Sequence, residues 1–285
     1  MHAIDQILEA EFALRSRHPE RDTVYSRHRV ASEEYRANSE CFLDVRYAPG
    51  PRCLLDVFPA GDDAPVLFFI HGGYWRALDK DIVSFIAAPF QKAGITVVMP
   101  GYDLVPVVRV GDIVDQIRAA FSWLVETIGP KEVVVAGHSA GGQLAAMLAL
   151  DQAEKGGGPI VGFAGVSGAY DLRPLLRTSI NRDLTLTPEE AAAVSPLVRL
   201  QALAPGAPLV PLLAAYGGRE TKGFKAWSTD LVAAWQARGA PAATLERDGC
   251  THFTILDATA EEGDAVHVTI EGLFQRANGA SRETA

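Results

Sequence analysis

The residues of this chain that most clearly allow chemistry form a GxSxG pentapeptide at positions 137–141. A run of β-branched residues comes directly before it, and strong helix formers from 143 to 151 follow. This order predicts a sharp strand-to-helix turn with Ser139 at its tip, where glycine neighbours let strand and helix approach closely. A glycine-rich turn without chemistry is the alternative, but the flanking strand and helix favour a nucleophile. We therefore expect Ser139 to attack an acyl carbon.

A second glycine-rich stretch, HGGYW at positions 71–75, follows a predicted strand at 66–70. Loops of this kind supply backbone N–H groups to an oxyanion hole, and glycines keep side chains away from the developing charge. We expect four residues, on this loop and directly after the nucleophile, to line such a hole: Gly72, Gly73, Tyr74 and Ala140.

Two histidines follow Ser139 in the sequence, and one of them lies where a general base is needed. For a serine on such a turn, the order along the chain is Ser, then Asp or Glu, then His. His252 lies on a predicted loop just past the last predicted strand. His267 lies inside the final helical pattern and is predicted to be a surface side chain. We predict that His252 takes the proton from Ser139 and passes it to the leaving group.

Other reactive side chains near these motifs are interpreted as structural. His71 is expected to brace its own turn, and His138 has no evident acid partner. Cys250 lies two residues before His252, which allows a thiol nucleophile as an alternative. Ser139 already occupies the turn, so a passive cysteine is preferred.

The acid of the triad is predicted from its position relative to the strands. A predicted strand at 209–216, the one before the last, runs into the GGRE segment that ends at Glu220. We therefore predict Glu220. Asp248 is the alternative because it is close to His252 in the sequence, but it follows the last strand and is expected to face solvent. A buried Glu220 carboxylate would need partners, which the His252 imidazole and loop N–H groups would supply.

Composition and charge limit the partners and the compartment. The 285 residues, 48% hydrophobic and 21% charged, suit one large α/β domain. The formal net charge of −9 argues against nucleic acid as a partner, because phosphates are bound by basic surfaces. Residues 1–22 are charged, and no long apolar run is present, so we expect a cytoplasmic protein that does not enter a membrane. The three cysteines lack CxxC spacing, and no disulfide framework, metal site or cofactor is expected.

From residue 66 onward, strand and helix patterns alternate, which is typical of a parallel sheet covered on both faces. Before it, residues 1–40 form an arm that is either a surface wrap or a flap over the site through Tyr25 or Tyr35. Two strands after the arm are expected to form an antiparallel hairpin at the sheet edge. The predicted strands are 41–47, 53–58, 66–70, 95–99, 133–136, 160–166, 209–216 and 242–247. The predicted helices are 79–93, 111–128, 141–154, 222–238 and 260–276.

We expect residues 1–285 to form a single α/β domain, because no repeat or low-complexity linker divides the chain. Its sheet should be mostly parallel and eight-stranded, with an antiparallel N-terminal edge. The segment 170–198 interrupts the alternation beyond the carboxyl end of a strand, where ligands bind in open α/β sheets. It is the expected lid or substrate wall.

With these residues in place, the sequence resembles the α/β-hydrolase kynurenine formamidases (arylformamidases) and related esterases. The resemblance extends from about residue 42 to 275, and the HGGYW and SGAYDL segments are its more specific parts. It implies the α/β-hydrolase fold, and Ser139, Glu220 and His252 match the triad by position. The family usually has Asp where this chain has Glu220, a departure that weakens inference about the exact substrate.

The resemblance implies hydrolysis of an N-formyl group from an arylamine, or of small acyl esters. An aromatic small-molecule substrate would suit a stacking wall of Tyr74, Trp75 and Tyr170, although these rings could instead pack under loops. A carboxylesterase of another pathway is the alternative function. A hydrolase fold that only binds ligands is a remote alternative, because every catalytic position is filled. A homodimer is compatible with the sequence.

Overall fold

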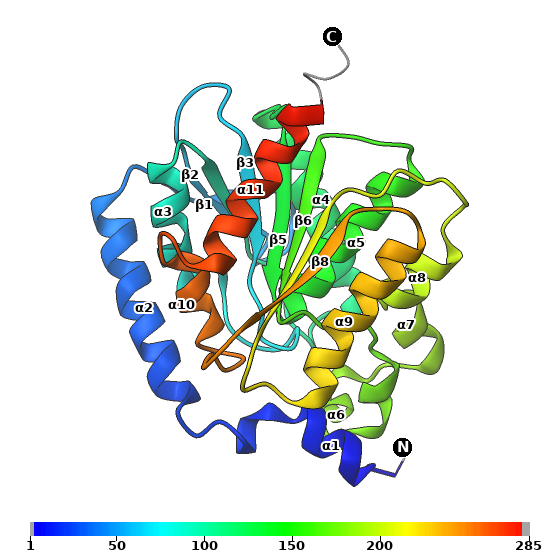
Figure 1. The fold of residues 1–285 in the computed structure, drawn as a ribbon. Helices are drawn as coiled ribbons and strands as arrows, with labels where there is room; N and C mark the ends of the chain where they lie inside the picture. Colours follow the sequence, from blue (N-terminus) through cyan, green and yellow to red (C-terminus); the bar gives the residue numbers. More distant parts are fainter. Residues whose placement is uncertain (1–2, 281–285) are drawn as a thin grey trace.

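The computed structural model describes residues 3–280, which form one eight-stranded sheet with helices on both faces (Figure 1). The strand order is β1-β2-β4-β3-β5-β6-β7-β8. β2 pairs antiparallel with β1 and with β4, and the remaining pairs are parallel. The predicted sheet with its antiparallel N-terminal edge is confirmed. The strands are β1 Phe42–Arg46, β2 Leu54–Phe58, β3 Val66–Ile70, β4 Thr96–Pro100, β5 Val133–His138, β6 Ile160–Val166, β7 Leu212–Gly217 and β8 Ala242–Arg247.

The helices cover the sheet from both sides and also form the N-terminal arm and the insertion after β6. The α-helices are α1 Gln6–Phe12, α2 Arg21–Asn38, α3 Ala87–Lys92, α4 Val110–Thr127, α5 Ala140–Glu154, α6 Asn181–Leu184, α7 Pro188–Ala193, α8 Pro196–Ala202, α9 Lys222–Ala237, α10 Ile255–Ala260 and α11 Ala265–Ala280. Short 3₁₀ turns are η1 Leu14–Ser16, η2 Lys80–Ile82, η3 Ser84–Ile86 and η4 Arg173–Arg177. Within residues 3–280, no helix combines the length and the apolarity needed to cross a membrane.

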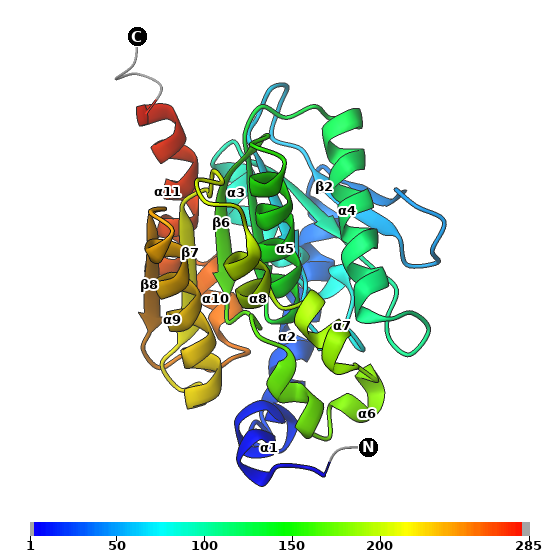
Figure 2. The same cartoon turned by 90° about the vertical axis from the view of Figure 1, so that its right-hand side faces the viewer.

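The central strands are apolar at nearly every position because both of their faces are buried. In β3, the side chains of Val66, Phe68 and Ile70 belong to the core that includes α4, α5 and α9. Leu67 and Phe69 belong to the opposite core, with α3, α10 and α11. Figure 2 shows α4 and α5 on one side of the sheet and α11 on the other. Strand periodicity therefore divides the interior into two cores.

The predicted helix at 79–93 is wrong in its first half. The chain forms the two 3₁₀ turns η2 and η3 before α3 begins at Ala87. Pro89 lies in the first turn of α3, where its missing N–H costs nothing. A helix running through residue 89 from residue 79 would clash there with the carbonyl of Phe85.

The last predicted helix, 260–276, begins too early. α10 ends at Ala260, and α11 starts at Ala265 after a turn that contains Gly263 in the left-handed region, at φ 84°. Asp264 Oδ1 accepts from Val266 N–H at 2.9 Å and so begins the new helix. His267 is only 4% exposed and packs on Phe90 with ring centroids 4.5 Å apart, so the expectation of a surface side chain is wrong.

The N-terminal arm is helical and is fastened to the domain at both ends. In α2, Arg27 Nη1 and His28 Nε2 bind Asp257 Oδ1 of α10 at 2.9 and 2.8 Å. Figure 1 shows α1 at the foot of the sheet, beside the first turn of α9. This foot is where the carboxyl ends of the parallel strands lie and where the loops that follow the strands begin.

Candidate active site

Ser139 lies between the last residue of β5 and the first residue of α5, in a strained conformation with φ 56° and ψ −117°. Glycines on both sides make this turn sterically feasible. A Cβ on Gly137 would lie 2.2 Å from Gly141 O, and a Cβ on Gly141 would lie 2.0 Å from Ile70 O. A non-glycine backbone held at positive φ costs about 1–3 kcal/mol. The strand-to-helix turn predicted around Ser139 is therefore present, and it carries the strain typical of a nucleophile elbow.

The loop after β3 brings its backbone directly against the elbow. A Cβ on Gly72 would lie 2.8 Å from His138 O and 3.0 Å from Ser139 Cβ, so only glycine fits there. Gly73 and Tyr74 follow at positive φ, 117° and 52°. Ala140 opens α5, so its N–H belongs to the first turn, where N–H groups point out of the helix end. The four residues predicted for the oxyanion hole thus lie on the two segments that meet at Ser139.

His71 is packed as a brace of this loop. Its Nδ1–H donates to Gly72 O at 2.7 Å, and its ring stacks on Tyr102 with centroids 4.3 Å apart and planes 4° apart. The Tyr102 hydroxyl donates to His71 O at 2.9 Å. Burial lowers the pKa of His71 to about 4, so the ring is neutral at physiological pH. A neutral, fully packed ring fits the structural role expected for His71.

His252 and Glu220 form a buried pair close to the elbow. His252 Nδ1–H donates to Glu220 Oε2 at 2.9 Å, and the two residues are 2% and 8% exposed. Glu220 lies in the turn between β7 and α9, and His252 lies on the loop after β8. This contact fixes the imidazole tautomer and leaves Nε2 free to exchange a proton.

His138 links the His252 loop to the elbow. Its Nε2–H donates to His252 O at 2.7 Å, and the two rings lie 4.8 Å apart. Burial is the main reason that the pKa of His138 lies well below its ordinary value, and the neighbouring His252 adds to the effect. The ring next to Ser139 is thus a neutral donor with a structural contact, as the sequence indicated.

The Glu220 carboxylate has two partners besides His252. Its Oε1 accepts from Gly217 N–H at 2.7 Å and from Ser167 Oγ at 2.5 Å. The Gly217 contact is of the expected loop N–H type, but the sequence interpretation missed Ser167. The sequence feature that could have pointed to Ser167 is its position at the start of the SGAYDL segment, directly after β6. Asp248, the alternative acid, is exposed.

Two of the three expected aromatic wall residues are fully buried. Trp75 is fully buried and donates from Nε1 to Gln143 Oε1 at 2.9 Å. Tyr170 is fully buried, with its hydroxyl 1.7 Å from where a Cβ on Gly165 would be. Neither ring offers a face to a ligand, because both are fully buried, and Tyr170 fills the space that Gly165 and Gly168 leave without a side chain. Tyr74 is half-buried and directly follows the two glycines of the loop.

The end of α1 lies over these loops. The Tyr74 hydroxyl donates to Phe12 O at 2.6 Å, and Thr221 Oγ1 donates to Glu11 O at 2.9 Å. The Phe12 ring stacks on Trp227 with centroids 4.3 Å apart. Since Tyr74 follows the glycine loop and Thr221 follows Glu220, α1 bridges the two sides of the site. We call residues 5–13 the N-terminal strap.

The strap also binds the insertion after β6. Glu9 accepts from Ser179 N–H at 2.7 Å and from Ser179 Oγ at 2.5 Å. Asp5 pairs with Arg177 at 2.9 Å. Tyr25 packs on Phe253, the residue after His252, with ring centroids 5.5 Å apart, and Tyr35 packs on Phe58. The arm therefore meets the site through Glu11 and Phe12 of the strap, and of the two tyrosines named from the sequence Tyr25 contacts the residue next to His252.

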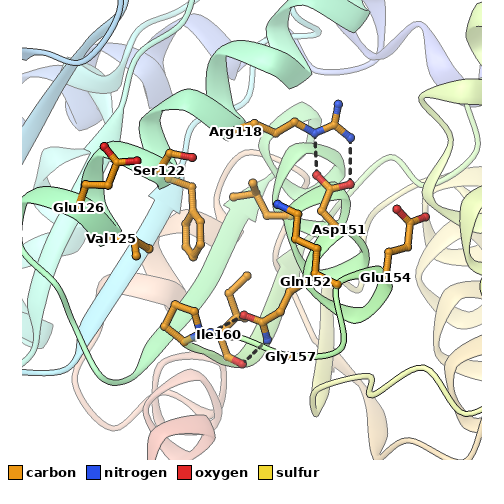
Figure 3. A pocket seen from close by; sticks show the side chains of 14 residues that line it. Arg118, Ser122, Val125, Glu126, Asp151, Gln152, Glu154, Gly157 and Ile160 are labelled. Atoms are coloured by element: carbon orange, nitrogen blue, oxygen red, sulfur yellow. Dashed lines mark hydrogen bonds and ion pairs between the residues drawn. The ribbon is translucent and has the colours of Figure 1, made fainter.

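A cavity of about 460 Å³ lies between α4 and α5 near the start of β6 (Figure 3). Two of the charged side chains that line it are paired with each other, since Arg118 Nε contacts Asp151 Oδ2 at 2.6 Å. The nearest α5 residue that lines it is Leu148, roughly 13 Å along the helix from Ser139. This cavity therefore lies at the amino ends of the parallel strands, whereas the candidate site lies at their carboxyl ends. In the described part of the chain, His, Cys, Asp and Glu side chains form no group of three that could hold a metal ion.

Comparisons with known proteins agree with this geometry. Residues 67–255 match the family described as the alpha/beta hydrolase fold. A kynurenine formamidase of Salmo salar is 32% identical over 245 residues, covering 84% of this chain and 83% of the relative. One of Danio rerio is 30% identical over 237 residues, covering 81% of each. A crystal structure of a provisionally assigned thioesterase from Silicibacter sp. has a TM-score of 0.80 at 30% identity, covering 92% of this chain and 98% of that one.

The family match contains the elbow, the glycine loop, Glu220 and His252, and the relatives align over most of the chain. The resemblance inferred from the motifs is therefore confirmed. This chain belongs to the α/β-hydrolase family and is a hydrolase of the group that includes the kynurenine formamidases.

Proposed function

We propose that Ser139, His252 and Glu220 act as a catalytic triad that removes a formyl group from an aryl amine, with N-formylkynurenine as the first candidate substrate. The observation that carries the proposal is the buried His252–Glu220 pair, tied through His138 to a strained Ser139. The two formamidase relatives supply the substrate class.

In the first half of the reaction, His252 Nε2 accepts the Ser139 hydroxyl proton as Oγ bonds to the formyl carbon. The carbonyl oxygen becomes an oxyanion, which N–H groups of the glycine loop and of Ala140 stabilise. The tetrahedral intermediate collapses as His252 returns the proton to the aniline nitrogen, and the C–N bond breaks. The arylamine leaves, and a formyl ester remains on Ser139.

In the second half, water attacks the formyl ester while His252 takes its proton. The C–O bond to Ser139 breaks, the serine regains a proton from His252, and formate leaves. Throughout, the Glu220 carboxylate holds the imidazole in one tautomer and stabilises its charged form without taking a proton.

The exposure of the site supports a compact substrate. Ser139 is 4% exposed and His252 is 2% exposed, because the strap and the insertion pack over the loops around them. A formyl group is the smallest acyl group, and an aryl ring can rest against the half-buried Tyr74. Long acyl chains need an extended apolar trough. We propose that the strap and the 170–198 segment act together as the wall that limits substrate size.

A small acyl ester or thioester is the second candidate substrate. The 30% identical structure that carries the thioesterase assignment favours this class. A triad with an oxyanion hole attacks esters, thioesters and activated amides by the same steps.

A side-by-side measurement of kcat/KM separates these candidates. The compounds are N-formylkynurenine, phenyl acetate, an acetyl thioester and p-nitrophenyl esters from butyrate to dodecanoate. We expect the formamide to match or exceed the best ester, and dodecanoate to be the poorest ester. A formamide value well below every ester would reject the formamidase proposal, and a preference for dodecanoate would reject the compact site.

A further inference from the structure

Ser167 occupies a backbone position that disfavours a side chain. It directly follows β6, is fully buried and has φ 51°, in the left-handed region. Its N–H donates to Ala215 O at 2.7 Å, so pairing with β7 continues through it. Glycine would adopt this conformation without strain. A serine in this strained conformation, where glycine would be unstrained, indicates that its hydroxyl has a specific role.

The Ser167 hydroxyl donates a hydrogen bond to one oxygen of Glu220. Oε1 accepts from Ser167 Oγ at 2.5 Å and from Gly217 N–H at 2.7 Å. Oε2 accepts from His252 Nδ1–H at 2.9 Å. The two carboxylate oxygens therefore have separate tasks, because one is anchored to the sheet edge and the other holds the imidazole.

Anchoring matters because a glutamate side chain has three rotatable bonds, and the last one turns the carboxylate plane freely. The Gly217 N–H alone would hold Oε1 at one point, around which the carboxylate could still turn. A second donor from a different strand removes that freedom. Ser167 comes from the end of β6 and Gly217 from the end of β7, so the two donors approach Oε1 from separate elements.

We propose that Ser167 is a positioning residue that fixes the Glu220 carboxylate so that Oε2 remains aimed at His252. The inference rests on the proposed function, in which His252 is the base. It adds a fourth side chain to the arrangement, one that acts only through Glu220 and touches no substrate.

A double-mutant cycle between Ser167 and Glu220 tests the proposal. S167A removes a hydrogen bond to a charged group and should lower kcat for phenyl acetate by about tenfold to a hundredfold, with KM within about threefold. In an E220Q background, where the charge that the hydroxyl orients is gone, S167A should cost less than about threefold. Equal losses in both backgrounds, or S167A within twofold of wild type, would overturn the proposal.

Two further variants separate positioning from a loss of packing. Ser228 is also fully buried, and its Oγ has no hydrogen-bond partner within residues 3–280. S228A is therefore the matched control and should keep wild-type kcat. S167G removes the hydroxyl while relieving the strain of positive φ. It should be at least as stable as S167A and equally slow, and full activity in S167G would contradict the role of the hydroxyl.

A measurement without turnover keeps this inference distinct from the proposed function. In S139A, the His252 Nδ1–H bound to a buried carboxylate should give a far-downfield proton NMR signal. Adding S167A should shift this signal upfield or broaden it, and adding S228A should not. An unchanged signal overturns the positioning role even if the chain hydrolyses formamides. A changed signal with no hydrolysis of any substrate supports the positioning role and rejects the proposed function alone.

Discussion

At the scale of single residues, the proposed triad makes the orientation of His252 depend on the Glu220 carboxylate, which accepts from its Nδ1–H. Replacing this carboxylate by an amide places an N–H group opposite Nδ1 and favours the wrong imidazole tautomer. Glu220→Gln should therefore lower kcat by about a thousandfold or more. Asp248→Asn changes an exposed residue and should leave kcat within about twofold. Steady-state kinetics with phenyl acetate measure kcat for both variants. A larger loss of kcat in Asp248→Asn than in Glu220→Gln would assign the acid role to Asp248.

His71 makes stability depend on pH with a definite sign. Its pKa in the folded protein is lowered to about 4 by burial. The unfolded chain titrates near the ordinary value of about 6.5, so below that pH the unfolded state binds a proton that the folded state does not. Stability from this group is complete above about pH 6.5 and is lost as pH falls toward 4. At pH 5 the free energy of unfolding should be about 2 kcal/mol lower than at neutral pH because His71 is kept neutral in the folded protein.

Chemical denaturation at about pH 7.5 and pH 5 measures this loss. His138, whose pKa is also lowered, should add to it in the same direction. In His71→Gln, which is expected to be less stable at both pH values, the difference between them should shrink by about 2 kcal/mol. An undiminished pH dependence in that variant would show that His71 is not held neutral in the folded protein.

The residues that the sequence could locate are those with a local pattern around them. Ser139 has the pentapeptide, and His252 and Glu220 have their positions relative to strands. Ser167 has no such pattern, because its contact with Glu220 spans 53 positions and exists only after β6 and β7 pair. Aromatic identity likewise does not say which way a ring points, so Trp75 and Tyr170 were expected at the site and lie in the core.

At the scale of elements, apolar runs bounded by turns were sufficient to predict the sheet. The bounds of β3, β6 and β8 agree with prediction, and the apolar runs of β3 and β6 end at the polar residues His71 and Ser167. The region before α3 was not predictable by helical periodicity alone, since η2 and η3 keep apolar residues buried without a regular helix. The strap could not be placed from sequence either, because its partners are side chains and backbone groups of three segments that are distant in the sequence.

The strap leads to a prediction about substrate size. Phe12 stacks on Trp227, and its carbonyl holds the Tyr74 hydroxyl, so the ring anchors the strap over the site. Phe12→Ala should loosen the strap and raise kcat/KM for p-nitrophenyl octanoate several-fold relative to p-nitrophenyl acetate. The comparison of the two esters within one variant removes any general change in activity.

Ile7 provides the control for this test because it lies on the same helix and is 76% exposed. Ile7→Ala should leave the ratio of the two esters as in the wild type. If Phe12→Ala also leaves that ratio unchanged, the strap is a surface wrap and does not limit the size of the acyl group.

At the scale of the whole molecule, the site exists only when distant parts of the chain have folded together. The glycine loop follows β3, Ser139 follows β5, Ser167 follows β6, Glu220 follows β7 and His252 follows β8. Parallel strands end at one edge of the sheet, so consecutive loops meet there, as expected for ligand sites in open α/β sheets. The cavity between α4 and α5 lies at the opposite end of the parallel strands, and none of Ser139, Glu220 and His252 lines it.

The most direct test of this arrangement is labelling of the purified protein with a fluorophosphonate probe, followed by mass spectrometry of the labelled peptide. A serine reacts with such a probe only when a base removes its proton and donors stabilise the tetrahedral phosphorus. We predict one adduct, on Ser139, that is absent from Ser139→Ala and forms far more slowly in Glu220→Gln. No labelling of the folded wild-type chain, or an adduct on another residue, would contradict the assignment of Ser139 as the nucleophile.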